Sequence, residues 1–274
     1  MGFSRPLVMG ILNITPDSFS DGGKYPTVQV AIAHAGRMIA EGADWIDIGG
    51  ESTRPNAEPV EPLIEQRRVI PVIEQLCDTV SGARISIDTR NSETAKLAIE
   101  AGAQMVNDVS GGLHDKEILS VVAKTEAQYV IMHMRGSPLN MAELTKYKNV
   151  ADDVKQELLT RVGAAIKAGI DKSKVLIDPG IGFAKTPEQS YQLLRELSKF
   201  CDTDYRVVVG CSRKRLIGFI DQSTPDKRLG GSVALAAYSV LQGAAMVRVH
   251  DVAETRQAVD VAAYLRGFAK MQFV

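Results

Sequence analysis

Two short segments near the end of the chain carry positively charged side chains in positions where they could bind an anion. CSRKR (Cys211–Arg215) and RVHD (Arg248–Asp251) each follow an apolar run, and Arg54 adds a third cationic position. Arginine holds phosphate oxygens through two parallel donors, whereas lysine acts as a movable point charge. In an extended strand, Arg248 and His250 point the same way. These residues form either a solvated basic surface or an anion site, and their positions after apolar runs favour the anion site.

Acidic and amide side chains end three other apolar runs, at Asp88, Asn107 and Asp178. Any one of them can cap the next helix or pair with a buried arginine. Together, however, they suit the edge of a flat nitrogen heterocycle, because a carboxylate accepts two parallel N–H bonds and an amide both donates and accepts. The three residues therefore predict a heterocycle-binding site.

A third group follows the first apolar run, which ends at Asn13 and is followed by Asp17 and Asp21. Amide and carboxylate oxygens suit Mg²⁺, which keeps several waters and binds substrate phosphates through few protein ligands. The Asp-Gly-Gly sequence at Asp21 is equally typical of a plain turn. The segment is compatible with either interpretation.

Histidine and cysteine do not indicate a metal centre. His133 ends an apolar run without a partner at metal-ligand spacing, so its role is left open. The three cysteines lack a CxxC pair, which argues against a disulfide framework and favours a reducing cytoplasm. The absence of GxSxG and P-loop motifs removes two further classes of enzyme site.

The residues that could take part in chemistry recur in a regular pattern. Each lies at the end of a short apolar run, and the segment between two successive runs is long enough for one helix. The eight runs end at Asn13, Gly49-Gly50-Glu51, Asp88, Asn107-Asp108, His133, Asp178, Ser212-Arg213-Lys214 and Arg248-Val249-His250. This order predicts a (β/α)₈ TIM barrel of the α/β class, whose active site forms at the carboxyl ends of the strands. A flavodoxin-like doubly wound sheet is the alternative, but it rarely needs eight strands in unbroken order.

The elements that must position these residues are expected to be short buried strands and amphipathic helices. The strands are predicted over Leu7–Leu12, Trp45–Ile48, Arg84–Ile87, Met105–Val106, Tyr129–Met132, Val175–Ile177, Val207–Val209 and Met246–Val249. The helices are predicted over Val28–Ala40, Leu63–Val80, Glu93–Ala101, Lys116–Lys124, Val150–Ala168, Glu188–Phe200, Leu229–Gly243 and Ala253–Phe268. Gly42, Gly102 and Gly169 are expected to cap helices in a left-handed conformation. The long polar loops Asn13–Thr27 and Glu51–Pro62 are expected to close over a substrate.

Composition fits one globular domain over residues 1–274. Apolar residues make up 45% and charged residues 24%, with a net charge of −1, so there is no bulk signal for a nucleic-acid partner. No apolar run nears the roughly 18 residues of a membrane span, and the N-terminal stretch is too short for a signal peptide. We therefore expect a cytoplasmic protein with neither a membrane nor a nucleic-acid partner.

Over essentially its whole length, the chain resembles the dihydropteroate synthase family. The matching segments are GILNITPDSFSDGG (Gly10–Gly23), DIGGESTRP (Asp47–Pro55), SIDT (Ser86–Thr89), NDVSG (Asn107–Gly111), MHMRG (Met132–Gly136), DPGIGF (Asp178–Phe183), SRK (Ser212–Lys214) and RVHD (Arg248–Asp251). The resemblance implies a barrel, a homodimer, and the joining of 6-hydroxymethyl-7,8-dihydropterin diphosphate to 4-aminobenzoate in folate synthesis. It also implies that diphosphate is released and that sulfonamides occupy the aminobenzoate pocket.

The resemblance assigns a role to each matching residue. The pterin ring is assigned to Asp88, Asn107, Asp178 and Lys214, with Val109, Met132, Gly182 and Phe183 lining the slot. The diphosphate is assigned to Asn13, Arg248 and His250, with Mg²⁺ as the cofactor at Asn13. The 4-aminobenzoate is assigned to Phe19, Thr53, Arg54, Pro55, Ser212 and Arg213. Asp88, Lys214 and Asp21 are the implied catalytic residues, with Asp21 closing the first loop. Where some members have a serine after the SRK lysine, this chain has Arg215.

Three other functions share part of this pattern. A pterin-dependent methyltransferase domain has the same pterin-binding acids but needs no diphosphate site, so the SRK and RVHD segments favour the synthase. A catalytically silent pterin-binding subunit should have lost the first loop or the cationic group, and both are present. A general phosphate-binding barrel enzyme would not explain the group formed by Asp88, Asn107 and Asp178.

Overall fold

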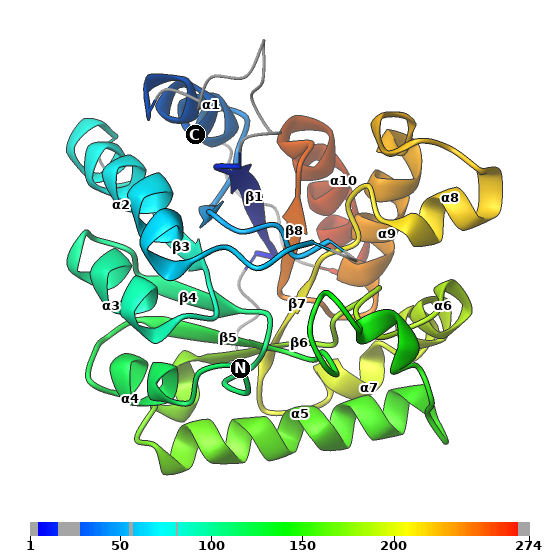
Figure 1. The fold of residues 1–274 in the computed structure, drawn as a ribbon. Helices are drawn as coiled ribbons and strands as arrows, with labels where there is room; N and C mark the ends of the chain where they lie inside the picture. The colour runs from blue at the N-terminus through cyan, green and yellow to red at the C-terminus, as the bar shows by residue number, and fades with distance from the viewer. Residues whose placement is uncertain (1–4, 16–27, 55–56, 81, 268–274) are drawn as a thin grey trace.

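Eight parallel strands follow one another around a closed barrel in a computed structural model that describes residues 5–15, 28–54, 57–80 and 82–267 (Figure 1). The strands are β1 (Leu7–Asn13), β2 (Trp45–Gly49), β3 (Ile85–Asp88), β4 (Met105–Asp108), β5 (Gln128–Met132), β6 (Val175–Asp178), β7 (Arg206–Val209) and β8 (Met246–Val249). β8 pairs with β1, with Met9 opposite Arg248, and this pairing closes the barrel. The predicted fold class is confirmed, and each predicted strand end lies within two residues of the observed one.

Helices cover the outside of the barrel. They are α1 (Val28–Ala40), α2 (Pro62–Thr79), α3 (Ser92–Glu100), α4 (Glu117–Ala123), α5 (Val150–Lys167), α6 (Pro187–Arg195), α7 (Ser198–Cys201), α8 (Arg215–Asp221), α9 (Leu229–Leu241) and α10 (Val252–Leu265). Short 3₁₀ turns lie at Met141–Glu143, Lys172–Lys174 and Pro225–Lys227. In the part of the chain that is described, no helix is long and apolar enough to cross a membrane.

Two helical predictions were wrong. The helix expected over Glu188–Phe200 is divided into α6 and α7, and α8 was not predicted at all. α6 begins with a capping box, in which Thr186 and Gln189 satisfy each other's backbone N–H groups. Leu197 in the turn between α6 and α7 and Phe200 in α7 are both completely buried, so tertiary packing overrides the continuous helical periodicity.

The barrel interior is filled by an apolar layer near its amino-terminal end. This layer contains Met9, Trp45, Met105, Val130, Leu176, Val208 and Met246, all buried. Because side chains alternate along a strand, residues two positions further on point into the same interior, nearer to the carboxyl ends. The outward-facing strand residues pack with the helices in a separate and larger core.

The turns from helix to strand use the glycines that were expected to cap the helices. Gly42, Gly102 and Gly169 have φ of +99°, +114° and +105°, so the three predictions are confirmed. An added Cβ at Gly102 would lie 2.5 Å from Sγ of Cys77 on α2, so this position excludes a side chain by contact as well as by φ.

Replacing Gly102 with alanine is expected to lower the free energy of unfolding by about 1–3 kcal/mol, because the backbone conformation is unfavourable for alanine. The matched control is Gly163→Ala in α5, where an added Cβ meets nothing within 4 Å. That change should stabilise the chain by about 0.5–1 kcal/mol through helix propensity. Urea denaturation of both variants measures the difference, and wild-type stability of Gly102→Ala would contradict the strain argument.

Candidate functional site

Directly above the apolar layer, the side chains that point into the barrel interior are polar. Asp47, Asn107 and Arg248 come two positions after Trp45, Met105 and Met246 on β2, β4 and β8. The strand alternation that buries the apolar side chains therefore also turns these polar groups inward. The carboxyl ends of the strands thus surround a charged interior, as the barrel prediction requires.

Arg248 is the centre of this charged interior. Its Nε lies 2.5 Å from Oδ2 of Asp47, and one Nη lies 2.7 Å from Oδ2 of Asp88. Asn107 donates from Nδ2 to the same Asp47 oxygen at 3.0 Å. The acidic group and the cationic group, which sequence reasoning treated as separate, are therefore joined through one guanidinium.

The carboxylates around Arg248 are deeply buried. Asp47 is 0% exposed and Asp88 is 8% exposed. Burial raises the pKa of Asp88 to about 7, although the Arg248 guanidinium opposes that shift.

Asp47 is a site residue that sequence reasoning missed as an individual position. The sequence feature that could have revealed Asp47 is a single acidic residue inside a strand expected to be buried on both faces. An unpaired charge is strongly unfavourable in such a strand.

Asp178, which ends β6, and Lys214, which directly precedes α8, are two further groups of opposite charge. Burial raises the pKa of the Asp178 carboxyl, and the Lys214 charge opposes that shift. Burial likewise lowers the pKa of Lys214, against the attraction of Asp178. The Lys214 ammonium donates to the Ile181 carbonyl at 2.6 Å and lies 4.8 Å from the centre of the Phe183 ring.

An apolar wall stands beside these charges. Val109, Met132, Met134, Met141 and Ala184 form one buried cluster, and Phe183 packs against it. The structure brings together three residues that were expected to line a slot, namely Val109, Met132 and Phe183. A flat ligand with polar edges fits a site that has charged groups on one side and this wall on another.

Ser212 orients the ring of His250. The His250 backbone N–H donates to Ser212 Oγ at 3.1 Å, and the same oxygen forms a hydrogen bond of 3.0 Å with His250 Nδ1. Burial lowers the pKa of His250 to about 4, so the ring is a neutral donor at physiological pH.

Arg213 is less available than the sequence suggested. Its guanidinium pairs with the Asp251 carboxylate, with Nε 3.0 Å from Oδ2. The backbone at Arg213 has φ of +56°, which is uncommon for a residue other than glycine. Its N–H donates to Ser232, and its carbonyl accepts from Arg228. The SRK turn is thus held on several sides in an unfavourable conformation.

The loop after β2 is anchored by a buried ion pair that was not predicted. Arg90 holds the Glu51 carboxylate through two hydrogen bonds of 2.8 and 3.1 Å, and Val60 N–H donates to the same carboxylate. This pair fixes both ends of the segment that carries Thr53 and Arg54, and Arg54 is exposed. Of the other residues expected in the two long loops, Phe19, Asp21 and Pro55, along with Asp17, lie outside the described residues.

Asn13 ends β1 beside the acidic group. A Cβ placed on Gly49 would lie 3.7 Å both from Oδ1 of Asn13 and from Oδ2 of Asp88, so both oxygens approach one point in the mouth. In the described ranges, no three His, Cys, Asp or Glu residues are grouped to hold a metal. An amide oxygen and a carboxylate oxygen are ligand types that suit Mg²⁺, which binds through few protein ligands.

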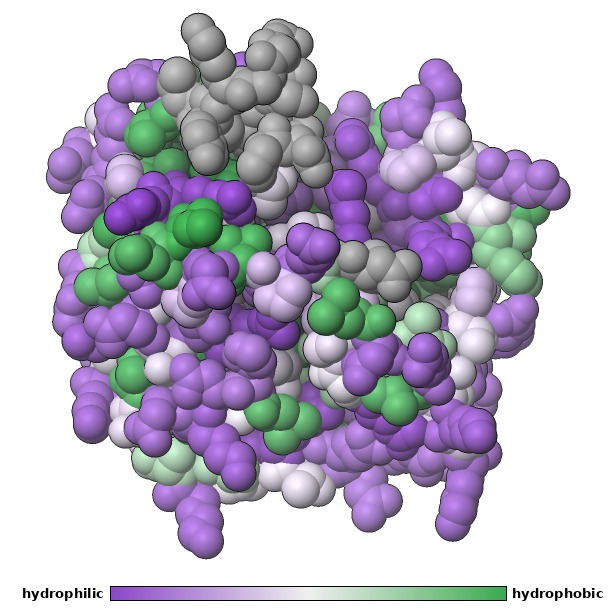
Figure 2. All heavy atoms as spheres, in the orientation of Figure 1, coloured by the Kyte–Doolittle hydropathy of each residue, from purple (hydrophilic) through white to green (hydrophobic). Residues whose placement is uncertain are grey.

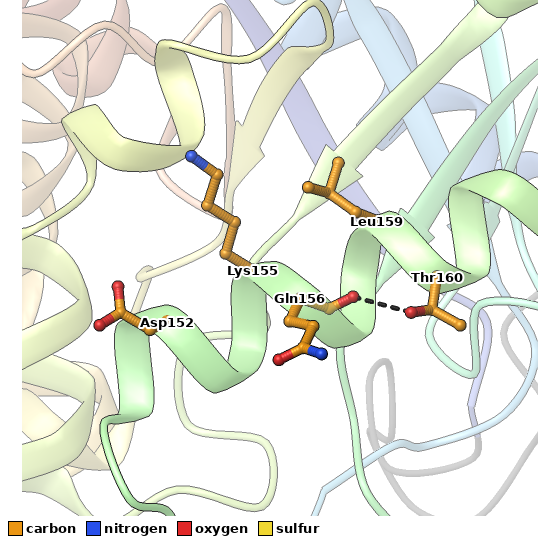
Figure 3. A pocket seen from close by; sticks show the side chains of 5 residues that line it. All are labelled: Asp152, Lys155, Gln156, Leu159 and Thr160. Atoms are coloured by element: carbon orange, nitrogen blue, oxygen red, sulfur yellow. Dashed lines mark hydrogen bonds between the residues drawn. The ribbon is translucent and has the colours of Figure 1, made fainter.

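A hollow on the outer face of α5 is a different kind of feature. Figure 3 shows its lining residues splayed along a single helix: Asp152, Lys155, Gln156, Leu159 and Thr160. The hydrogen bond drawn there, from Thr160 Oγ1 to the Gln156 carbonyl, belongs to the helix itself. Because these groups do not converge on one point, the mouth of the barrel remains the candidate active site.

Comparisons with known proteins agree with this geometry. Residues 9–250 match the family model described as pterin binding enzyme. The chain is 44% identical over 259 residues to a dihydropteroate synthase of Synechocystis, covering 94% of this chain and 89% of the relative. It is 45% identical over 266 residues to the folic acid synthesis protein fol1 of Schizosaccharomyces pombe, covering 95% of this chain but only 36% of that longer protein.

A solved structure also superimposes on nearly the whole chain. It is the dihydropteroate synthase of Xanthomonas albilineans with 4-aminobenzoic acid, which is 44% identical at a TM-score of 0.90. The alignment covers 96% of this chain and 94% of that one. The chain therefore belongs to the pterin-binding enzymes and, within them, to the dihydropteroate synthases of folate synthesis.

Proposed function

We propose that this chain joins 6-hydroxymethyl-7,8-dihydropterin diphosphate to 4-aminobenzoate and releases diphosphate at the mouth of the barrel. The observation that carries this proposal is the junction of Asp88 and Asn107 with Arg248 inside the barrel. It puts acceptors suited to a pterin edge beside a cation suited to a diphosphate. The relative with 4-aminobenzoic acid bound supports the second substrate.

The pterin ring is assigned to the inner part of the site. Asp88, Asn107 and Asp178 offer the carboxylate and amide groups that match its polar edges. Lys214 lies over Phe183 and next to Gly182, where the ring has a flat surface and a cation on one side. Val109 and Met132 complete the slot.

The diphosphate is assigned to the outer part, with Asn13, Arg248 and His250. Arg248 donates hydrogen bonds from Nε to Asp47 and from one Nη to Asp88. Among the described residues, the other Nη forms no hydrogen bond. We assign this nitrogen as the donor to the phosphate. Neutral His250 adds a further N–H donor. Mg²⁺ at Asn13 supplies electrostatic stabilisation of the leaving diphosphate when it is bound.

In the proposed reaction, the amino nitrogen of 4-aminobenzoate attacks the pterin methylene carbon. The bond from that carbon to the diphosphate oxygen breaks, and the proton that the nitrogen loses is taken up by the released diphosphate. Arg248 stabilises the charge that develops on the leaving group, and the Asp88 carboxylate stabilises the electron-poor pterin. An aromatic amine is already neutral at pH 7, so the attack needs no strong base.

The outer loops are assigned to 4-aminobenzoate and to the exclusion of water. Phe19, Thr53, Arg54, Pro55, Ser212 and Arg213 are proposed to contact this substrate, and Asp21 to close the first loop. Water must be excluded because hydrolysis competes for the same electron-poor carbon. The three free thiols are typical of a reducing compartment, so the cytoplasm is the proposed location.

Lys214→Ala and Asp178→Ala are each expected to reduce condensation by at least about 100-fold, because each removes one charge of the pair that faces the pterin. The assay incubates purified protein with the pterin diphosphate, Mg²⁺ and labelled 4-aminobenzoate, and measures dihydropteroate. Lys167→Ala, on the exposed face of α5, is the control. Near-normal turnover by either folded variant would refute the assignment.

Arg248→Met is expected to lower the free energy of unfolding by about 3 kcal/mol, because it leaves Asp47 and Asp88 buried without their cation. The exposed Arg215→Met serves as the control and should change stability by less than about 0.5 kcal/mol. Urea denaturation midpoints measure both. Equal stabilities of the two variants would show that the guanidinium does not balance these carboxylates.

We also propose a homodimer formed through the outer surface of α8, α9 and α10. Large apolar side chains are exposed there, including Phe219, Ile220, Val261, Tyr264 and Leu265. Figure 2 shows hydrophobic spheres at the right edge, where Figure 1 places α8. Such a concentration is typical of an interaction surface.

Tyr264→Glu with Leu265→Glu is expected to convert the dimer to a monomer, because each subunit then contributes two charges to an apolar contact. Sedimentation velocity measures the mass. Leu159→Glu on α5, away from this surface, should leave the mass unchanged. A double variant that sediments like the wild type would exclude this surface as the interface.

A further inference from the structure

His133, the histidine without an assigned role, lies in a chain of buried polar contacts behind the pterin wall. It follows β5 and is 0% exposed. Its Nδ1 lies 2.9 Å from Nζ of Lys185, a residue that is itself only 7% exposed. On the other side of the ring, Nε2 lies 3.0 Å from Oε2 of Glu157. Lys185 was not singled out from the sequence.

The chemistry of these contacts determines the state of the histidine. A lysine ammonium only donates hydrogen bonds, so Nδ1 is the acceptor and the ring proton is on Nε2, which donates to Glu157. Burial and the neighbouring Lys185 charge lower the pKa of His133 to about 3, so the ring stays neutral. His133 thus presents a fixed acceptor to Lys185.

Besides its contact with His133, Lys185 donates hydrogen bonds to the loop that carries the residues proposed to face the pterin. It donates to the Gly180 carbonyl at 3.0 Å and to the Phe183 carbonyl at 2.8 Å. With His133 Nδ1, these are the three shortest contacts of the ammonium, and the His133 carbonyl lies farther away at 3.4 Å. Burial lowers the pKa of the Lys185 ammonium well below its usual range, and the Asp178 charge opposes that shift. Lys214, Arg161 and Glu157 are the other charged groups that face Lys185.

The loop from residue 179 to residue 184 needs such support because its backbone is unfavourable. Gly180, Gly182 and Ala184 have φ of +66°, +83° and +51°, and this last value is costly for alanine. A Cβ on Gly180 would lie 1.9 Å from the His133 carbonyl oxygen, so the loop also lies tightly against His133. Lys214 holds the same loop from the other side through Ile181.

We propose that Lys185 is a positioning residue that holds the loop 179–184 in its pterin-binding conformation, with His133 as its fixed acceptor. The inference rests on the proposed function in one respect, namely that this loop contacts a pterin. Lys185 itself acts from behind the wall through the carbonyls of Gly180 and Phe183.

The first test replaces Lys185 with methionine, which keeps the length of the side chain and removes all three donors. KM for the pterin diphosphate, and Kd for an unreactive pterin measured by calorimetry, should both rise at least about tenfold, as expected for the loss of charged hydrogen bonds. KM for 4-aminobenzoate should stay within about twofold of the wild-type value if only the loop changes. Lys174→Met, at a lysine paired with Glu126 on the surface, is the control.

The second test separates the two nitrogens of His133 and leaves Lys185 in place. Asparagine keeps an acceptor near the position of Nδ1, whereas glutamine places its amide near Nε2 and leaves Lys185 without that acceptor. His133→Asn should therefore bind the unreactive pterin more tightly than His133→Gln. Hydrogen exchange of the loop amides should be faster in His133→Gln than in His133→Asn.

A failure of the inference about Lys185 can be distinguished from a failure of the proposed function. Absence of dihydropteroate from the wild-type reaction would overturn that function, while the exchange rates of the loop still test the role of Lys185. Wild-type pterin affinity and wild-type loop exchange in folded Lys185→Met would overturn the inference. If Lys185→Met does not fold, the histidine pair decides, and equal pterin affinities with equal loop exchange in the two variants would refute the proposal.

Discussion

The structure depends on one buried arrangement of charge, in which the Arg248 guanidinium bridges the Asp47 and Asp88 carboxylates. These partners are 201 and 160 positions away along the chain, and they meet only because β8 pairs with β1. Removing two carboxylates from water is unfavourable unless a cation and further donors satisfy them. Barrel closure and site assembly are therefore one event, since an open sheet would leave these charges unpaired.

Much of the fold was predictable because strands buried on both faces are continuous apolar runs, and each run here ends at a polar residue. Gly42, Gly102 and Gly169 marked the turns for an equally local reason, since their positive φ disfavours other residues. The division between α6 and α7 was not predictable, because the periodicity continues across it and only the burial of Leu197 and Phe200 requires the turn.

The sequence pointed to candidate site residues one by one, but it did not show the contacts between them. Asp88, Asn107 and Arg248 were each identified from their places at strand ends, yet nothing in their spacing shows that Arg248 bonds directly to Asp88 and reaches Asn107 through Asp47. Asp47 was overlooked because it lies within a strand, and Lys185 because it lies beyond the loop that it supports. Contacts between residues far apart in sequence depend on barrel register and loop conformation, which local patterns do not encode.

Lys185 and Lys214 together stabilise the loop 179–184, which has positive φ at three residues and forms part of the apolar wall. Lys214 binds the Ile181 carbonyl from the mouth, while Lys185 binds the Gly180 and Phe183 carbonyls from behind. Both cations lie near Asp178, whose charge opposes the effect of burial on each of them. A single carboxylate therefore helps to keep both lysines charged, and a ligand that bonds to Asp178 acts on the groups that shape its own pocket. This coupling makes the strained loop conformation depend on the same charges that are proposed to bind the pterin.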